Sequence, residues 1–391
     1  MSRRPSLLLS SLLGMLLALS ACKPKQEETA QDGAPAARVV KIGFSAPLTG
    51  PQAHYGKDYQ NGVQLALDDA NALNPVIGGQ PVQFTLVAED DMADPKTATQ
   101  VAQRVLDAGV AGVIGHFNSG TSIPASKVYS DAGMPQIAMA TAPAFTQQGF
   151  KTTFRSMTSD TQQGSVMGSF AVKKLEAKKI AIIDDRTSYG QGLADEFEAA
   201  AKEAGGTIVA REFTSDKASD FMAILTSIKS KKPDAIFFGG TDVQSGPLAK
   251  QIKQIGLKLP LLSGEMTRSD TFLKLAGDAA EGTIASLAGV PMDKMPGGAD
   301  FLARFKARFG EPEIYSPYGY DATRILIAAM LKADSTDAAK YLPVLASIQH
   351  AGVTAPNISY DTRGDLANGG ITVYKVMNGK WEVLETLGMA Q

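Results

Sequence analysis

Residues 179–213 read KIAIIDDRTSYGQGLADEFEAAAKEAGGTIVAREF and contain a complete strand–helix–strand pattern. The apolar, β-branched run at 179–184 predicts a buried strand, and apolar residues then recur at helical spacing between positions 193 and 204. A second β-branched run follows at 207–213. Two strands separated by one helix predict a parallel pair joined by a right-handed crossover. This unit therefore favours an α/β fold.

The same alternation extends in both directions along the chain. Strands are expected at 39–45, 83–88, 110–115, 136–140, 179–184, 207–213, 234–239 and 259–263. Helical patterns separate nearly all of them, and Asp94-Pro95 supplies an N-cap and a first-turn proline for one helix. So many units fit two α/β lobes better than one domain of about 350 residues. Near the C-terminus, Asn378-Gly379 between two short strands predicts a hairpin.

Composition limits the classes of function. The chain has 391 residues, and a hydrophobic fraction of 44% excludes a disordered protein. Lys and Arg number 38 against 40 Asp and Glu, so there is no net positive charge to attract a phosphate backbone, and no nucleic-acid partner is expected. One cysteine and three histidines exclude an internal disulfide and a Cys/His metal framework. We expect neither a metal nor a cofactor.

The N-terminus predicts export. Arg3 and Arg4 precede an apolar run, Leu7–Leu19, which is too short to span a bilayer but suits the core of a signal peptide. The run ends in LSAC, which resembles the lipobox of bacterial lipoproteins and implies lipid attachment at Cys22; the alternative is a chance thiol. We therefore expect a signal peptide at 1–21 and a flexible tether at 22–39.

Motifs for catalysis are missing from the sequence. There is no Walker loop, no Gly-x-Ser-x-Gly elbow and no His-Glu-x-x-His motif, so an enzyme is disfavoured. His116 follows a strand and is either a base or, more simply, a hydrogen-bonded structural residue. The pairs Asp90-Asp91 and Asp184-Asp185 lie at strand ends, where they either hold a metal or act as acid and base or, more simply, cap the next helix or line a solvated rim.

Five segments together resemble the branched-chain amino-acid-binding proteins of bacterial ABC transporters, the Leu/Ile/Val-binding type of periplasmic binding protein. They are IGFSAPLTGPQAHYGK (42–57), VIGHFNSGTSIPASKVYSDAG (113–133), ATAPAFT (140–146), IAIIDDRTSYGQGL (180–193) and GLKLPLLSGE (256–265). The resemblance implies two Rossmann-like lobes with parallel central sheets, joined by three crossovers and closing on a ligand. By analogy, the first lobe comprises 40–159 and 289–367, and the second comprises 160–288 and 368–391.

The loops after these strands carry the expected ligand groups. Asn118 and Ser119 lie between a strand and a helical pattern, where a helix N-terminus favours an anion such as a carboxylate. The resemblance implies that the Thr141 hydroxyl and the Ala140 carbonyl help to hold an amino-acid head group, and that Glu265 pairs with its ammonium. The alternatives are plain loop capping for the first four and a surface carboxylate for Glu265.

The resemblance also implies a wall around the ligand side chain. Tyr55, Tyr189 and Tyr315 match positions of aromatic residues that line the family's pocket, although each could instead be a core residue. Thr241 stands where relatives commonly place a tyrosine, which predicts a larger or more polar pocket. Relatives often have a disulfide near the serine loop, whereas this chain has Ala93 and Asn118.

These observations predict a lipid-anchored, monomeric binding protein, periplasmic or on the cell surface, that captures an aliphatic amino acid by hinge closure and delivers it to an ABC permease. Two other functions fit the same fold. One is a ligand-sensing or amide-binding receptor, and the other is a lipoprotein that activates cell-wall synthases. Neither requires Ser119, Thr141 and Glu265 together.

Overall fold

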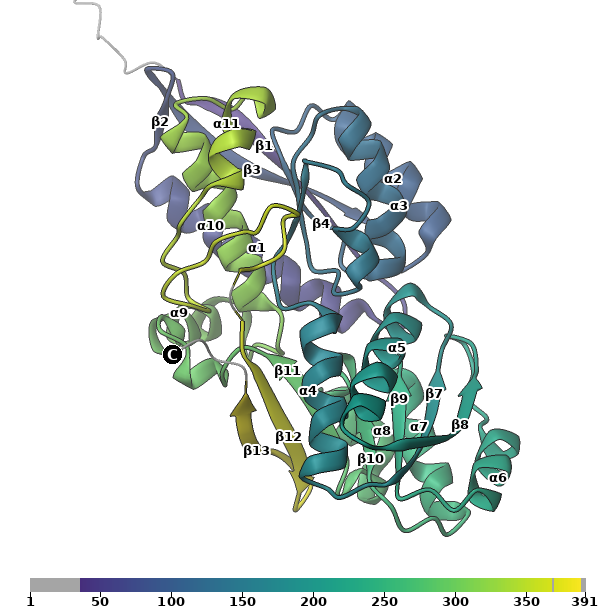
Figure 1. Cartoon of the computed structure of the whole chain (residues 1–391). Coiled ribbons are helices and arrows are strands. Elements are labelled where there is room, and N and C mark those ends of the chain that lie inside the picture. The colour runs from purple at the N-terminus through teal and green to yellow at the C-terminus, as the bar shows by residue number, and fades with distance from the viewer. Residues whose placement is uncertain (1–35, 368, 388–391) are drawn as a thin grey trace, which may run out of the picture. The chain divides into compact units, whose positions relative to one another are not determined.

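Two β-sheets organise the part of the chain that the computed structural model describes, residues 36–367 and 369–387 (Figure 1). Both belong to one compact unit that begins at Ala37. Strands within each sheet are mainly parallel, and helices cover both faces. The predicted α/β class with two parallel-dominated sheets is therefore confirmed.

The first sheet has the order β2-β3-β1-β4-β5-β6, with all neighbours parallel except β2 and β3. Its strands are β1 (Arg38–Ala46), β2 (Val76–Ile77), β3 (Gln80–Asp90), β4 (Val113–Gly115), β5 (Gln136–Ala138) and β6 (Thr153–Arg155). Helices α1 (Ala53–Ala72) and α10 (Ser316–Lys332) lie side by side on one face, and α2 (Pro95–Asp107) and α3 (Ser119–Asp131) on the other (Figure 1). The helices α9 (Gly298–Phe309) and α11 (Ala338–Ala346) and the short turn η1 (Pro143–Phe145) complete this part.

Alternation along β1 explains why both faces are covered. Ile42 and Phe44 belong to the main core together with residues of α1 and α10. Between them, Gly43 faces Val105 of α2, which lies 2.5 Å from where a glycine Cβ would stand. A strand with apolar contacts on both sides is typical of a parallel sheet buried between helices.

The second sheet has the order β13-β12-β11-β10-β9-β7-β8, parallel from β11 to β8 and antiparallel at β12 and β13. Its strands are β7 (Lys179–Asp184), β8 (Thr207–Phe213), β9 (Ala235–Gly239), β10 (Leu261–Ser263), β11 (Ile284–Ala288), β12 (Ile371–Met377) and β13 (Lys380–Leu387). Its helices are α4 (Asp160–Lys173), α5 (Ser188–Glu203), α6 (Met222–Ser230), α7 (Asp242–Gln254) and α8 (Asp270–Ala276), with the short turns η2 (Glu265–Thr267) and η3 (Gly277–Ala280) nearby, whereas η4 (Met292–Lys294) follows β11 and contacts α9. The predicted hairpin is confirmed, because Asn378 and Gly379 join β12 to β13 with φ of 54° and 73°.

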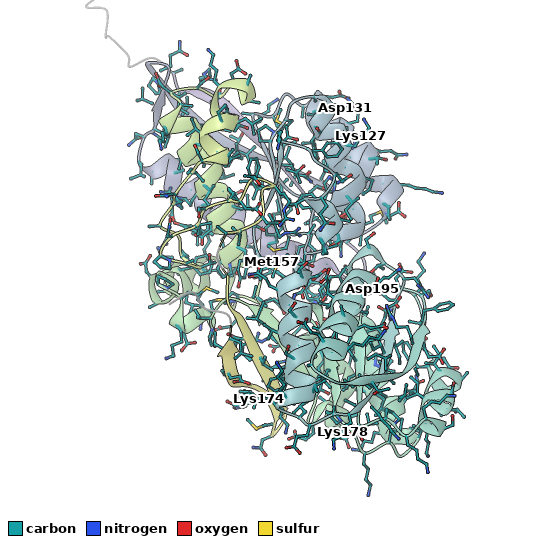
Figure 2. The ribbon with its side chains drawn as sticks, in the orientation of Figure 1. Lys127, Asp131, Met157, Lys174, Lys178 and Asp195 are labelled. Atoms are coloured by element: carbon teal, nitrogen blue, oxygen red, sulfur yellow. The ribbon has the colours of Figure 1, made fainter. Side chains whose placement is uncertain are left out.

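Three crossovers connect the sheets within the described residues. The chain leaves the first sheet between β6 and α4, returns after β11, and enters the second sheet again before β12. Figure 2 labels Met157, a fully buried residue of the first crossover. Below, the first sheet with its helices is called the first lobe, and the second sheet with α4–α8 is called the second lobe.

All of the predicted strands occur, with ends that differ by a few residues. The strands β2, β6 and β11 were not predicted. The predicted tether, 22–39, extends too far, because Arg38 and Val39 already belong to β1, where they pair with Val82 and Gln83 of β3. The predicted signal peptide and Cys22 lie outside the described residues. Within the described ranges, no helix combines the length and apolar character needed to cross a membrane.

Candidate functional site

A small cavity lies between the two lobes. Its walls come from both of them, and the space between the side chains is about 10 Å³. The lining residues are Phe117, Asn118, Ser119, Met139, Thr141, Tyr189, Glu265, Met266 and Tyr315. That volume is about the room needed by one water molecule. The lobes are therefore closed on each other, and any larger molecule enters only if they separate or their side chains move.

The ends of three strands explain why these residues meet. Phe117, Asn118 and Ser119 follow β4, Thr141 follows β5, and Glu265 follows β10. Strands β4 and β5 are parallel neighbours in the first sheet, and β10 belongs to the parallel part of the second sheet. The carboxyl ends of parallel strands are the usual place of ligand sites in α/β folds. Here the corresponding edges of two sheets supply the two sides of one site.

The first lobe contributes hydroxyl groups and the start of α3. Asn118 is the N-cap of α3 in an extended conformation, so Ser119 begins the helix. The Ser119 hydroxyl accepts a hydrogen bond from the Ala142 amide at 3.1 Å, which leaves its own proton free to donate. The first N–H groups of a helix have no partner within that helix and favour a negative charge. This side of the site is therefore suited to an anionic group.

Arg155 holds the loop that carries Thr141. Its guanidinium is completely buried and donates to the carbonyls of Ala140 and Ala142, to the Thr146 hydroxyl at 3.0 Å, and to Asp365 at 2.8 Å. The carbonyl of Ala140 is therefore engaged by Arg155 and does not line the cavity. Thr141 itself is buried, and its hydroxyl has no hydrogen-bond partner among the described residues.

The second lobe contributes a buried carboxylate. Gln163 Nε2 donates to Glu265 Oε2 at 2.7 Å, and the Tyr189 hydroxyl donates to the same oxygen at 3.0 Å. Burial raises the pKa of Glu265 above its ordinary value, although hydrogen bonds, including those from Gln163 and Tyr189, act in the opposite direction. Gly264 permits the arrangement, because a Cβ at this position would lie 2.5 Å from the Tyr189 hydroxyl.

A second carboxylate, Asp160, lies next to this group. Asp160 begins α4, and its amide donates to the carbonyl of Thr141 at 2.8 Å. Its side chain is completely buried, and neither oxygen has a hydrogen-bond partner among the described residues. Burial first, and then the charge of Glu265, raise the pKa of Asp160 well above its ordinary value. Because two buried carboxyl groups lie next to each other, this part of the site favours the binding of a cationic group.

Aromatic rings form the third side of the site. The rings of Phe117 and Tyr315 meet edge to face with centroids 4.7 Å apart, and Tyr55 stacks on Phe117 at 5.8 Å. The segment that carries Tyr315 is fixed by Asp58, whose carboxylate accepts the amides of residues 313–316. The Tyr315 hydroxyl is buried and has no hydrogen-bond partner in the described part of the chain.

Two hydrogen bonds join the lobes directly across the site. His54 Nε2 of α1 lies 2.9 Å from Asp242 Oδ2 of α7. The Tyr55 hydroxyl of α1 donates to the carbonyl of Met266 in η2. Both contacts connect residues more than 180 positions apart in the chain. They stabilise the closed arrangement and would break if the lobes separated.

Six of the nine residues predicted for ligand binding line the cavity: Asn118, Ser119, Thr141, Tyr189, Glu265 and Tyr315. Tyr55 lies behind Phe117, and Ala140 faces Arg155. Thr241 is the N-cap of α7, where it forms a capping box with Gln244, and it is not among the lining residues. Asp160, Gln163 and the His54–Asp242 contact were not predicted, and nothing in the sequence pattern distinguishes them from ordinary helix residues.

The other polar residues considered from the sequence have structural surroundings. His116 is completely buried, and its ring contacts Asp91 at 2.7 Å and the Tyr129 hydroxyl at 3.1 Å, which confirms the hydrogen-bonded structural interpretation. Asp90 accepts the amide of Leu48. Burial raises the pKa of Asp185, which accepts the Thr187 amide, to about 6. Over the described ranges, no group of three or more His, Cys, Asp or Glu residues is placed to hold a metal ion.

Comparison with known proteins identifies the architecture around this site. The model of the family described as periplasmic binding protein matches residues 39–380. The chain belongs to the periplasmic binding protein family. Membership of this family implies that the protein works outside the cytoplasm and binds a substrate for transport.

This periplasmic binding protein is similar to relatives with named ligands. It is 35% identical to the "Leu/Ile/Val-binding protein homolog 1" of Brucella suis over 87% of this chain and 91% of the relative. It is 33% identical to the "Leucine-, isoleucine-, valine-, threonine-, and alanine-binding protein" of Pseudomonas aeruginosa, over 87% and 90%. Among solved structures, it resembles a branched-chain amino acid transporter substrate-binding protein of Streptococcus pneumoniae in complex with isoleucine. The TM-score is 0.81, the identity 26%, and the coverage 90% of this chain and 99% of the other.

Proposed function

We propose that this protein captures an aliphatic amino acid between its lobes by hinge closure and delivers it to an ABC permease, without catalysing a reaction. The observation that carries the proposal is a pair of buried carboxylates: Glu265 lines the same cavity as the start of α3, and Asp160 lies next to Glu265. An amino acid carries both complementary charges, an ammonium group for the carboxylates and a carboxylate for the start of α3.

The ammonium group explains the carboxylates. A buried charge without a partner costs several kcal/mol, and two neighbouring carboxylates cost more. Both hydrogen bonds to Glu265 end on Oε2, so Oε1 would meet the ligand ammonium. Asp160 and the unpartnered Thr141 hydroxyl lie next to each other and would supply further acceptors. Binding would then offset the burial that raises the pKa of both groups, and also the repulsion by Glu265 that adds to the shift of Asp160.

The carboxylate end is explained by the first lobe. Ser119 can donate its hydroxyl proton, and the first amides of α3 add donors at the positive end of the helix dipole. Asn118 is held by the Gln52 side chain at 2.7 Å, which fixes the entry into the helix. These groups belong to one lobe and Glu265 belongs to the other, so one ligand would connect both lobes.

The side-chain end is apolar and adaptable. Phe117, Met139 and Met266 line the cavity, and methionine side chains fill and vacate space easily because they are unbranched. The Brucella and Pseudomonas relatives are named for leucine, isoleucine and valine, and the latter also for threonine and alanine. These names and the apolar lining support an aliphatic side chain.

The remaining predictions belong to the same proposal. The protein would be a monomer, exported by the signal peptide at 1–21 and held at a membrane by a lipid on Cys22, with residues 22–37 as the tether. Its lobes would comprise 40–159 with 289–367 and 160–288 with 368–391, and would rotate about the three crossovers. No residue of the cavity is assigned a catalytic role.

Calorimetric titration of the purified protein with amino acids and matched analogues tests the proposal. Leucine, isoleucine or valine should bind. 4-Methylpentanoate, which lacks the ammonium, and 3-methylbutylamine, which lacks the carboxylate, should each bind at least tenfold more weakly. Equal binding of leucinamide and leucine would favour the amide receptor. Binding of no amino acid would favour the cell-wall interaction protein and contradict the proposal.

A further inference from the structure

A second cavity lies at the crossovers between the lobes. Its volume is about 400 Å³, which falls within the range of small-molecule sites. None of the described residues that line it also lines the cavity around Glu265. It is therefore separate from the amino-acid site, and the proposed function makes no use of it.

Each of the three crossovers contributes to its wall. Thr158 comes from the first crossover, Gly289 and Val290 from the second, and Gly369 and Gly370 from the third. The crossovers also contact one another directly. The Gly289 amide donates to the Gly370 carbonyl at 2.7 Å, and a Cβ on Gly369 would lie 2.6 Å from the Thr158 hydroxyl. Any rotation of the lobes about these segments therefore changes the shape of the cavity.

The lining is mainly apolar. Val290, Pro296, Ala355 and Leu366 supply carbon surface. The Tyr318 hydroxyl is already engaged, because it donates to the Ala288 carbonyl at 2.6 Å. A molecule in this cavity would thus gain stability mainly from apolar contact.

One positive charge lies at the cavity. Lys294 is the single charged residue among the described lining residues. Its ammonium lies 3.1 Å from Asp293, and both side chains are more than 60% exposed. An exposed pair of this kind contributes little, so the lysine can turn to another anion.

We propose that this cavity is a second binding site, for a small and largely apolar carboxylic acid, and that its occupation favours the closed lobes. The cavity has this shape while the His54–Asp242 and Tyr55–Met266 contacts are made. A ligand that binds one arrangement better shifts the population toward it, and the coupling between two sites is reciprocal. The effect on amino-acid binding rests on the proposed function, whereas the site itself does not.

Calorimetry with 3-phenylpropionate as the probe tests the site. Parent protein should bind the acid. Ala355→Phe and Val290→Phe fill the cavity from two different walls, and each should weaken binding by about tenfold or more. Lys294→Gln should weaken binding of the acid by about threefold and leave binding of the neutral 3-phenylpropan-1-ol unchanged. Lys127→Gln, on the exposed surface of α3, is the matched control (Figure 2).

The same probe distinguishes this site from the amino-acid site. Saturating 3-phenylpropionate should tighten leucine binding by about threefold, because both ligands favour closure. Loss of leucine affinity in proportion to the probe concentration would place the probe in the amino-acid site and overturn the proposal. So would unchanged probe binding in both phenylalanine variants.

Failure of the proposed function would look different. If no amino acid binds, parent protein should still bind the probe, and the phenylalanine variants should not. Closure is then measured by small-angle scattering with the probe alone. A smaller radius of gyration in parent protein, absent in Ala355→Phe, is expected; an unchanged radius would contradict the coupling to closure.

Discussion

His54 Nε2 lies 2.9 Å from Asp242 Oδ2, and this contact joins the first lobe to the second. The Asp242 side chain is fully buried, while His54 is 20% exposed. The same Asp242 oxygen accepts the Ser269 hydroxyl at 2.6 Å, which fixes the carboxylate. The pair therefore connects a titratable group on one lobe to a rigid charge on the other.

Closure should depend on pH through this pair. Burial lowers the pKa of His54, but the hydrogen bond and charge of Asp242, with a smaller effect of Glu313, outweigh it, so the pKa is raised. Because its pKa is raised in the closed form, protonated His54 stabilises that form. This contribution is complete below the ordinary pKa near 6.5 and is lost as the pH rises through the raised pKa. Parent protein should thus lose about two- to fivefold in leucine affinity over that window.

His54→Gln is the comparison for this pH profile. Glu265 and Asp160 also titrate, so the informative quantity is the ratio of the parent and variant affinities, measured by calorimetry between pH 5.5 and about 9. The ratio should fall toward one as the pH rises. A ratio that is constant across the range would show that His54 does not titrate with closure.

Glu265→Gln should weaken amino-acid binding by about ten- to several-hundred-fold. The change removes a charge-assisted hydrogen bond and leaves the ligand ammonium without this counter-ion. Ser119→Ala should reduce the affinity less, because the helix amides also hold the ligand carboxylate and Thr141 also holds the head group. Calorimetry measures both, with the exposed Glu203→Gln on α5 as control. Binding within twofold of parent in Glu265→Gln would refute the ammonium contact.

Asp160→Asn should stabilise the ligand-free protein and weaken ligand binding at the same time. A carboxyl whose pKa is raised on folding destabilises the folded state as the pH rises above its ordinary value, here 3.8. Removing the charge should raise the free energy of unfolding at pH 7 by on the order of 1 kcal/mol and reduce its decline between pH 4 and about 7. Urea unfolding at several pH values measures this. Asp131→Asn, an exposed residue in Figure 2, should change neither quantity.

Thr241→Ala should reduce stability by about 1 kcal/mol, because it removes an N-cap side chain. The affinity order of valine, leucine and phenylalanine should stay the same, since Thr241 does not line the cavity. Thermal unfolding and calorimetry test the two expectations. A changed order of affinities would restore Thr241 as a ligand contact.

Cys22→Ala should release the protein from membranes or leave its signal peptide uncleaved, because a lipid at this thiol is the proposed anchor. Incorporation of radiolabelled palmitate, followed by membrane fractionation, measures the effect. Labelling of the variant at the parent level would exclude Cys22 as the attachment site.

The fold class could be predicted from the sequence, and so could the site residues that directly follow a strand. Ser119, Thr141 and Glu265 were predicted mainly through the resemblance to the Leu/Ile/Val-binding proteins, and each follows a parallel strand, whose carboxyl end has a fixed place at the edge of the sheet. The β-branched runs that form β7 and β8 were found because their apolar residues mark a buried strand. The hairpin at Asn378 followed from local turn chemistry.

The remaining features depend on contacts between distant segments. Asp160 has the sequence context of an ordinary first helical residue, and only the fold buries it beside Glu265. His54 and Asp242 are 188 positions apart. The strand β6 reads Thr153-Phe154-Arg155, without the longer apolar run that marked the equally short strands β4, β5 and β10, and its last residue is the fully buried Arg155. Residue types such as these predict exposure, so their partners could not be anticipated.

The buried Arg155 determines how the site meets its ligand. Its acceptors are Ala140, Ala142, Thr146 and Asp365, all of them groups of the protein. The loop around Thr141 is thus ordered before any ligand arrives, and little conformational entropy is lost there on binding. Recognition should therefore begin on a preorganised first lobe, and the second lobe, with Glu265, should set how long the ligand stays. Changes in the first lobe would then alter the association rate, and changes in the second would alter the dissociation rate.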